Sequence, residues 1–196
     1  SVLGEFDKAI EYLGKALAIE KRSFGENNIK SSLTYINIGY AYQMQGDFDT
    51  TISYYTKALD IRINDLGEEH PDTATTYHSL AYIYLEKGDY SNAIKYATKA
   101  IDIQRKIYDS RHHLIAGAYN TLGVAYGRLG EFDKATYYLE QAIDIQKEAY
   151  SEPNPDLASS YCNIGDVLRM VGDYERAIEQ TSKGLDISIN IFGEEH

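Results

Sequence analysis

The sequence predicts an all-α solenoid built from repeated helix pairs, and three observations carry this prediction. A block of the form GDFDTTISYYTKALDI recurs along the whole chain, and a second block, TYINIGYAY, recurs between its copies. Apolar residues within both blocks are spaced three or four residues apart, as on one face of an α-helix. Glycine marks the boundary between the blocks five times, each 42 residues after the previous one, at Gly4, Gly46, Gly88, Gly130 and Gly172.

The residues between the blocks divide every complete repeat into two helices. A glycine such as Gly46 suits the left-handed residue that ends a helix, and Asp47 after it suits the cap of the next helix. Pro71 and Pro155 follow the longer connections, and each suits the first turn of a helix, where proline loses no hydrogen bond. These signals predict nine helices and no strand, over residues of about 6–23, 29–45, 48–65, 71–87, 90–108, 113–129, 132–149, 155–171 and 174–191.

The repeats follow one another without a linker, a low-complexity stretch or a shift in composition. The last residues, FGEEH ending at His196, match LGEEH ending at His70, which leads into another repeat. Because solenoids close their ends with polar capping repeats, we expect the chain to be a segment of a longer array. Apolar surface at its two ends would allow end-to-end self-association. We expect a single array over residues 1–196, with a partial repeat at 1–28 and repeats at 29–70, 71–112, 113–154 and 155–196.

Composition and charge favour a protein ligand over other kinds of partner. The chain has 30 acidic and 19 basic residues, a net charge of −11 that repels nucleic acid and anionic lipid headgroups. No apolar run approaches the roughly 20 residues that span a bilayer. Cys162 is the only cysteine, so the fold depends on packing and not on an internal disulfide, and a cytoplasmic location is expected.

The two blocks resemble the tetratricopeptide repeat. The first helix carries Tyr-x2-Leu/Ile-Gly/Ala-x2-Tyr, as from Tyr35 to Tyr42, and the second opens with Gly-Asp-Phe/Tyr, as at Gly46. Each repeat has 42 residues instead of about 34, and tyrosine replaces the common tryptophan. LGEEHPDTATTYHSLAYIYLEKGDY, from Leu66, is similar to the kinesin light chain group. The resemblance implies a right-handed superhelix whose concave wall is lined by the first helices and binds a protein or peptide.

One stripe of the first helix is expected to form the core. Tyr35, Tyr77, Tyr119 and Tyr161 share one position of the repeat, which is typical of packed rings with the hydroxyl at the edge and not of a ligand site. Small residues in the same stripe would let two helices approach closely, at Gly39, Ala81, Gly123 and Gly165.

Residues beside this stripe that vary between repeats are the candidates for ligand contact. Packing does not dictate them, and their Asn, Ser and Thr side chains can hydrogen-bond an extended peptide backbone. The alternative is that they are solvated helix faces. The candidate set is Leu33, Ile36, Asn37, Tyr40, Met44, Thr75, His78, Ser79, Tyr82, Glu86, Asn120, Thr121, Val124, Arg128, Ser159, Asn163, Asp166, Arg169 and Met170.

The candidates predict a polarised ligand. The N-terminal first helices supply apolar and aromatic residues such as Tyr40, whereas the C-terminal ones supply Arg128 and Arg169. We therefore expect a segment with an apolar or aromatic anchor beside acidic residues, similar to the cargo peptides of kinesin light chains. Asp166 and Glu86 nearby weaken the acidic preference. The Lys and Asn pair of a carboxylate clamp is absent from the corresponding positions.

No catalytic or metal-binding pattern is recognisable. No two histidines lie four apart on a helix with a carboxylate, and His112 and His113 are expected to be solvent-exposed in a connection. Cys162, expected to be half-buried near the groove, has no histidine at a recognisable catalytic spacing. We therefore predict a non-catalytic scaffold without a cofactor or metal. Two other roles stay open: a regulatory sensor arm of a larger signalling ATPase, kinase or transcription factor, and a structural spacer.

Overall fold

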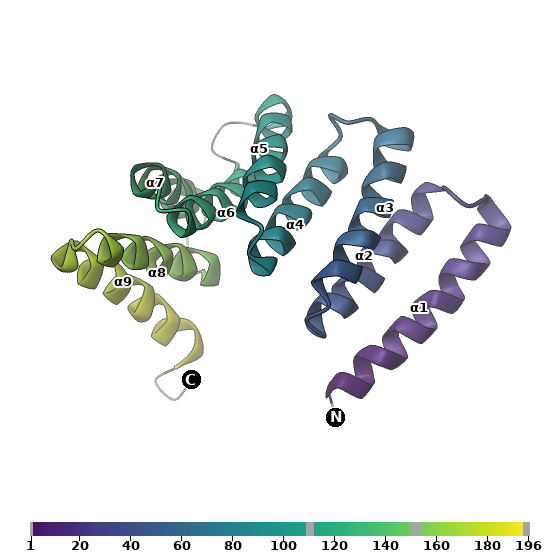
Figure 1. The fold of residues 1–196 in the computed structure, drawn as a ribbon, viewed down its shortest axis with the longest axis horizontal. Helices are drawn as coiled ribbons and strands as arrows, with labels where there is room; N and C mark the ends of the chain where they lie inside the picture. Colours follow the sequence, from purple (N-terminus) through teal and green to yellow (C-terminus); the bar gives the residue numbers. More distant parts are fainter. Residues whose placement is uncertain (1, 109–111, 150–153, 194–196) are drawn as a thin grey trace.

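The computed structural model describes residues 2–108, 112–149 and 154–193, which form nine α-helices and no strand (Figure 1). The all-helical prediction is therefore confirmed. Helix α1 comes first, and the remaining helices form four successive pairs. The bounds are α1 (Val2–Phe24), α2 (Ile29–Met44), α3 (Phe48–Leu66), α4 (Pro71–Lys87), α5 (Tyr90–Ile107), α6 (His113–Arg128), α7 (Phe132–Ala149), α8 (Pro155–Met170) and α9 (Tyr174–Phe192).

The largest difference from the expected bounds is at the start of α1. This helix was expected to begin near residue 6, after a turn at Gly4, but it begins at Val2 and runs through that glycine. The equivalent Gly46 and Gly88 have φ values of 78° and 83° and lie where a preceding helix ends. Gly4 instead lies within the first turn of α1, so the repeat position that ends a helix elsewhere is helical here.

Polar side chains begin the helices at the positions the repeat predicts. Asp47, Asp89 and Asp173 accept hydrogen bonds from the backbone N–H groups three residues later, which satisfies donors that a helix start leaves free. Their equivalent Glu131 forms an ion pair with Lys134 at 2.5 Å. The cap of α4 is His70, a residue that was not predicted as a cap. Its Nδ1 accepts a hydrogen bond from the Asp72 N–H at 3.1 Å.

The core follows the predicted stripe of the first helices. Tyr35, Tyr77, Tyr119 and Tyr161 are all buried, and the ring of Tyr77 lies 6.1 Å from that of Tyr96 on the paired helix. The predicted close approaches also occur. A Cβ on Gly39 would lie 2.7 Å from the Tyr55 ring, and a Cβ on either of two further glycines would overlap a side chain of the paired helix, at Gly123 and Gly165.

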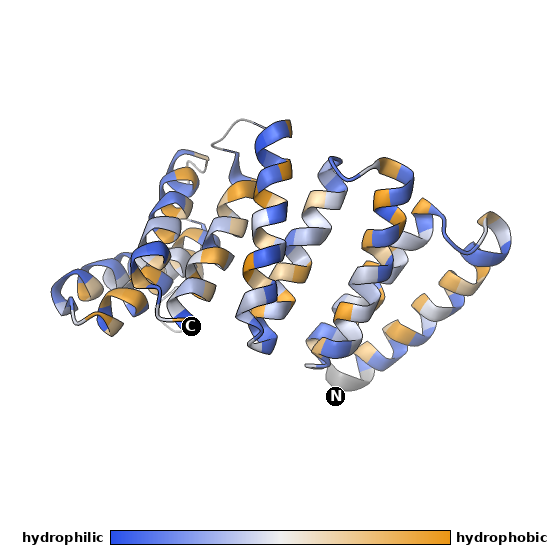
Figure 2. Cartoon of the chain, turned by 45° about the horizontal axis from the view of Figure 1, so that its top comes forward, coloured by the Kyte–Doolittle hydropathy of each residue, from blue (hydrophilic) through white to orange (hydrophobic). Residues whose placement is uncertain are grey.

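The helix pairs stack in a curved row with α1 and α9 at its two ends (Figure 1). Each helix packs against the next, and even-numbered helices also contact one another, α4 with α6 and α6 with α8. Within the described ranges, no two odd-numbered helices make a comparable contact. Since the more closely spaced layer of a curved stack lies inside the bend, the even-numbered helices line the concave side. Figure 2 shows hydrophobic and hydrophilic residues mixed along every helix, as expected where only one face is packed.

Candidate functional site

The N-terminal half of the concave wall exposes apolar side chains. On α2, Leu33 is 57% exposed, Tyr40 53% and Met44 41%, and on α4 Tyr82 is 42% exposed. Their neighbours in the predicted stripe are buried, so these side chains project from a packed layer. A cluster of exposed large apolar residues is unusual on a surface without a partner.

An open apolar hollow of about 640 Å³ adjoins this cluster between α1 and α2. Tyr40 lines it from α2, and Phe6, Tyr12 and Leu13 line it from α1. These three residues of α1 were not among the candidates predicted from the sequence. The repeat could have indicated that α1 presents an apolar face here. Phe6 and Leu13 correspond to Phe48 and Tyr55 of α3, whose apolar face packs against α2.

The middle of the wall is filled by contacts between first helices. The half-buried ring of His78 lies 3.3 Å, at Nε2, from the Thr121 hydroxyl, and a Cβ on Gly117 would come within 2.9 Å of the ring. Burial lowers the pKa of His78 below its usual value, an effect that the Gly117 backbone and Asp156 partly oppose. Thr121 itself is 2% exposed and its hydroxyl donates to the Gly117 carbonyl. The expectation that Thr121 faces a ligand is therefore wrong, because the neighbouring first helix covers it.

Polar residues in the C-terminal half join α6 to α8. Oδ1 of Asn120 accepts hydrogen bonds from the Ser160 hydroxyl at 3.2 Å and from the Asn163 amide at 3.1 Å. Ser160 is buried, so its hydroxyl depends on this contact. The amide oxygen that was expected to bind a peptide backbone is thus already bonded within the protein.

The two arginines of the candidate set line different hollows. Arg128 lines a small hollow of about 30 Å³ with Asn163 and Met170, while Arg169 lines one of about 380 Å³ between α8 and α9. Asp166 lines both hollows, and its Oδ1 lies 3.4 Å from Nη2 of Arg169. Among the described residues, Arg128 has no carboxylate within ion-pair distance, so it is the arginine left available to an acidic ligand.

The remaining candidates divide by exposure. Further members of the candidate set that are exposed are Asn37, Thr75, Glu86, Ser159 and Met170. Members that are half-buried between helices are Ile36, His78, Ser79, Asn120, Val124 and Asn163.

Two residues considered for chemistry have surroundings that differ from those expected. Cys162 as a whole residue is exposed and not half-buried. The thiol is still partly desolvated, and this desolvation, together with the nearby Asp166 carboxylate, raises its pKa. His112 is half-buried and not solvent-exposed, because its ring stacks on Tyr108 with centroids 4.1 Å apart and its Nδ1 accepts from the Leu114 N–H. Within the described ranges, no three His, Cys, Asp or Glu side chains are grouped closely enough to hold a metal ion.

Models of the tetratricopeptide repeat match the chain over residues 2–62, 30–106, 80–148 and 114–190. The chain belongs to the tetratricopeptide repeat family. Among solved structures, this tetratricopeptide array is similar to BtubC (BKLC) from P. vanneervenii, with 25% identity and a TM-score of 0.82 over 97% of this chain and 76% of that one. A putative kinesin light chain repeat protein from Podosopora anserina has 22% identity and a TM-score of 0.78, over 96% of this chain and 89% of that chain.

A third solved structure with this fold is a Rap protein complexed with Competence and Sporulation Factor. It has 18% identity and a TM-score of 0.75, over 95% of this tetratricopeptide array and 50% of the Rap chain. No curated protein matches the array in sequence. None of the helices in the described part of the chain is both long enough and apolar enough to cross a bilayer.

Proposed function

We propose that this tetratricopeptide array is a non-catalytic scaffold that binds a peptide or helix of a partner protein along its concave wall. The observation that carries the proposal is the exposed apolar cluster of Leu33, Tyr40, Met44 and Tyr82. These side chains lie on the wall of a curved stack whose other large apolar stripe is packed in the core. Aromatic and Met side chains are enriched in protein interfaces, and Tyr is among the residues that supply much of the binding energy.

The proposed ligand lies across the wall with its two parts in different surroundings. An apolar or aromatic residue packs on the N-terminal cluster and reaches the hollow lined by Tyr40. Acidic residues lie near Arg128, whose unpaired guanidinium is a local positive group in a chain of net charge −11. Asp166 lines the same hollow as Arg128 and limits how much negative charge the ligand carries there.

The middle and C-terminal contacts give this wall a fixed shape. His78 packs on Gly117, and Asn120 bonds to Ser160 and Asn163, so neighbouring first helices are held together before a ligand arrives. A preformed wall loses little conformational freedom on binding. The Rap protein of similar fold, complexed with Competence and Sporulation Factor, is one solved case in which this architecture holds another molecule.

Peptide-library binding, measured by fluorescence polarisation, tests the proposal. We expect selected peptides to contain an aromatic or large apolar residue followed or preceded by Asp or Glu. Tyr40→Ala should lower the affinity for the selected peptides by about tenfold or more, as loss of a central aromatic contact does. Tyr137→Ala is the matched control, because Tyr137 is 55% exposed on α7, outside the concave layer. Equal weakening by both substitutions, or selection of basic peptides, contradicts the proposal.

A further inference from the structure

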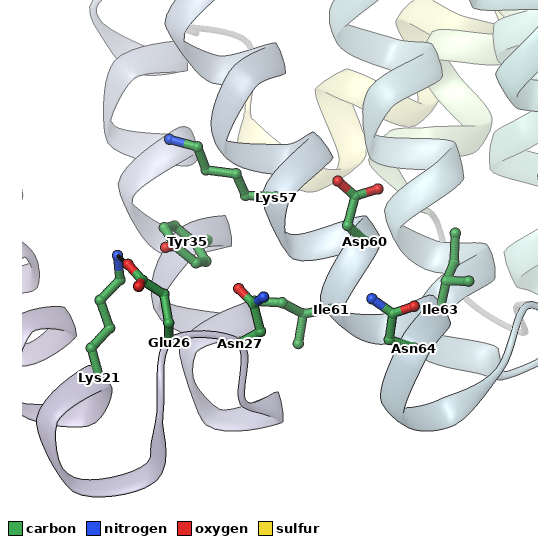
Figure 3. A pocket seen from close by; sticks show the side chains of 9 residues that line it. All are labelled: Lys21, Glu26, Asn27, Tyr35, Lys57, Asp60, Ile61, Ile63 and Asn64. Atoms are coloured by element: carbon green, nitrogen blue, oxygen red, sulfur yellow. Dashed lines mark hydrogen bonds and ion pairs between the residues drawn. The ribbon is translucent and has the colours of Figure 1, made fainter.

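A polar hollow of about 780 Å³ lies away from the concave wall, where the α1–α2 connection meets α3. Figure 3 shows its lining side chains, which include Lys21, Glu26 and Asn27 from the end of α1 and the connection. Lys57 and Asn64 line it from α3. A hollow of this volume falls within the range of small-ligand sites.

The next repeat contains the same hollow in a filled form. Residues 42 positions further on line a space of only about 200 Å³, with Glu68 and Glu69 facing α5. Oε1 of Glu68 lies 2.5 Å from Nζ of Lys99 and accepts from the Tyr77 hydroxyl at 3.1 Å. A second ion pair crosses the same space, because Nζ of Lys106 lies 2.5 Å from Oε1 of Glu69.

Three sequence differences open the first copy. Asn27 and Asn64 replace Glu69 and Lys106, so the second ion pair is lost. Lys21 stands where the next repeat has Ile63, and it draws the Glu26 carboxylate to 3.0 Å from its own Nζ. Glu26 corresponds to Glu68, so the carboxylate that pairs with lysine in the filled copy points elsewhere in the open one.

Lys57 is consequently left without an ionic partner. Its Nζ lies 5.0 Å from the ring centroid of Tyr54 and 5.9 Å from that of Tyr35. No carboxylate in the described residues comes within ion-pair distance of it, whereas the equivalent Lys99 is paired. In Figure 3 the Glu26 carboxylate is directed at Lys21, and Lys57 extends past the other side of the Tyr35 ring.

We propose that this hollow binds one carboxylate group of a ligand on Lys57, in the place that Glu68 occupies beside Lys99 in the next repeat. The side-chain amides of Asn27 and Asn64 donate hydrogen bonds to the polar group next to that carboxylate. The ligand is a monoanion, because Glu26 already neutralises Lys21 and Asp60 also lines the hollow. An acidic side chain and the free carboxyl end of a peptide both present this chemistry.

NMR titration of the whole chain with small probes tests the site. N-acetylglutamate α-amide carries only a side-chain carboxylate, N-acetylalanine carries only a terminal one, and N-acetylglutamine α-amide carries none. We expect the Asn27 and Asn64 side-chain amide signals to shift with the first two probes and not with the third. The probe that binds more tightly shows whether the ligand group is an acidic side chain or the carboxyl end of a peptide. No shift with either one overturns the proposal.

Substitutions separate this site from general attraction to lysine. Lys57→Gln should lower the affinity for the two carboxylate probes by roughly tenfold, as expected for loss of a charged hydrogen bond. Lys99→Gln, in the filled copy, should leave binding unchanged. Joint Asn27→Glu and Asn64→Lys substitution recreates the ion pair of the next repeat and should abolish binding. Binding that survives the joint substitution, or that falls equally in Lys57→Gln and Lys99→Gln, overturns the proposal.

Discussion

The two halves of the concave wall use equivalent positions in different ways. In the N-terminal half, Leu33, Tyr40 and Met44 of α2 project into solvent, and Asn37 is exposed. In the C-terminal half, residues of α6 and α8 bond to each other, with Asn120 as the shared acceptor. One half therefore leaves large apolar side chains exposed, while in the other half polar side chains bond neighbouring repeats to each other.

A single repeat position illustrates the difference. Ile36, His78, Asn120 and Cys162 are each separated by 42 residues. Ile36 packs against the apolar core, His78 fits beside Gly117, Asn120 accepts two hydrogen bonds and Cys162 is exposed. The contact that this position makes therefore differs from one repeat to the next.

The largest expected effect comes from overfilling the packed C-terminal half. A Leu side chain at Gly123 would overlap Leu139 and approach the Ala135 carbonyl. Gly123→Leu should therefore lower the free energy of unfolding by about 2 kcal/mol or more in urea denaturation. Gly14→Leu is the control, because Gly14 lies within α1 with open space around it and should lose no stability. A wild-type midpoint for Gly123→Leu would contradict the close approach of α6 and α7.

A smaller effect is expected from breaking the link between α6 and α8. Asn120→Ala removes the acceptor of two hydrogen bonds and leaves the buried Ser160 hydroxyl without it, so we expect a loss of about 1–2 kcal/mol. Asn37→Ala, on the exposed N-terminal half, should change stability by less than about 0.5 kcal/mol. Equal losses from the two substitutions would remove the distinction between the halves.

His78 gives the middle of the wall a dependence on pH. Burial lowers the pKa of its folded state, so above the ordinary value near 6.5 both folded and unfolded states hold it neutral. As the pH falls through that value, the unfolded state binds the proton first and stability decreases. The free energy of unfolding measured between pH 7.5 and 5 should therefore fall less steeply in His78→Gln than in the wild type. Parallel profiles for the two proteins would show that His78 titrates normally.

The weakest expected effect is self-association through the two ends of the stack. Tyr12 on α1 is 68% exposed and Ile178 on α9 is 69% exposed, whereas the corresponding side chains of the interior repeats are half-buried. We expect the weight-average mass in light scattering to rise with protein concentration. The joint Tyr12→Lys and Ile178→Lys substitution should suppress the rise, while Tyr137→Lys should not. A constant monomer mass for the wild type would contradict end-to-end contact.

The repeat predicted the features that depend on one helix pair alone. The bounds of α2 to α9, the buried Tyr77 and the close approach at Gly123 all follow from periodicity and spacing within 42 residues. Burial of Thr121 could not be predicted in this way, because it depends on how far α4 is offset from α6 across the superhelix. The open hollow at Lys57 was likewise missed, since comparing it with Lys99 requires knowing which residues meet across three helices.

We propose that the ligand bridges the two halves, with its apolar anchor on one and its acidic residues near the other. The most direct test is fluorescence polarisation of one selected aromatic-acidic peptide across a salt series. Arg128→Ala should weaken binding and flatten the salt dependence, and Arg169→Ala should do so less, because Arg169 is already paired with Asp166. Tyr40→Ala should weaken binding while leaving the salt dependence unchanged. A salt dependence that is the same in the wild type and in Arg128→Ala would contradict the account.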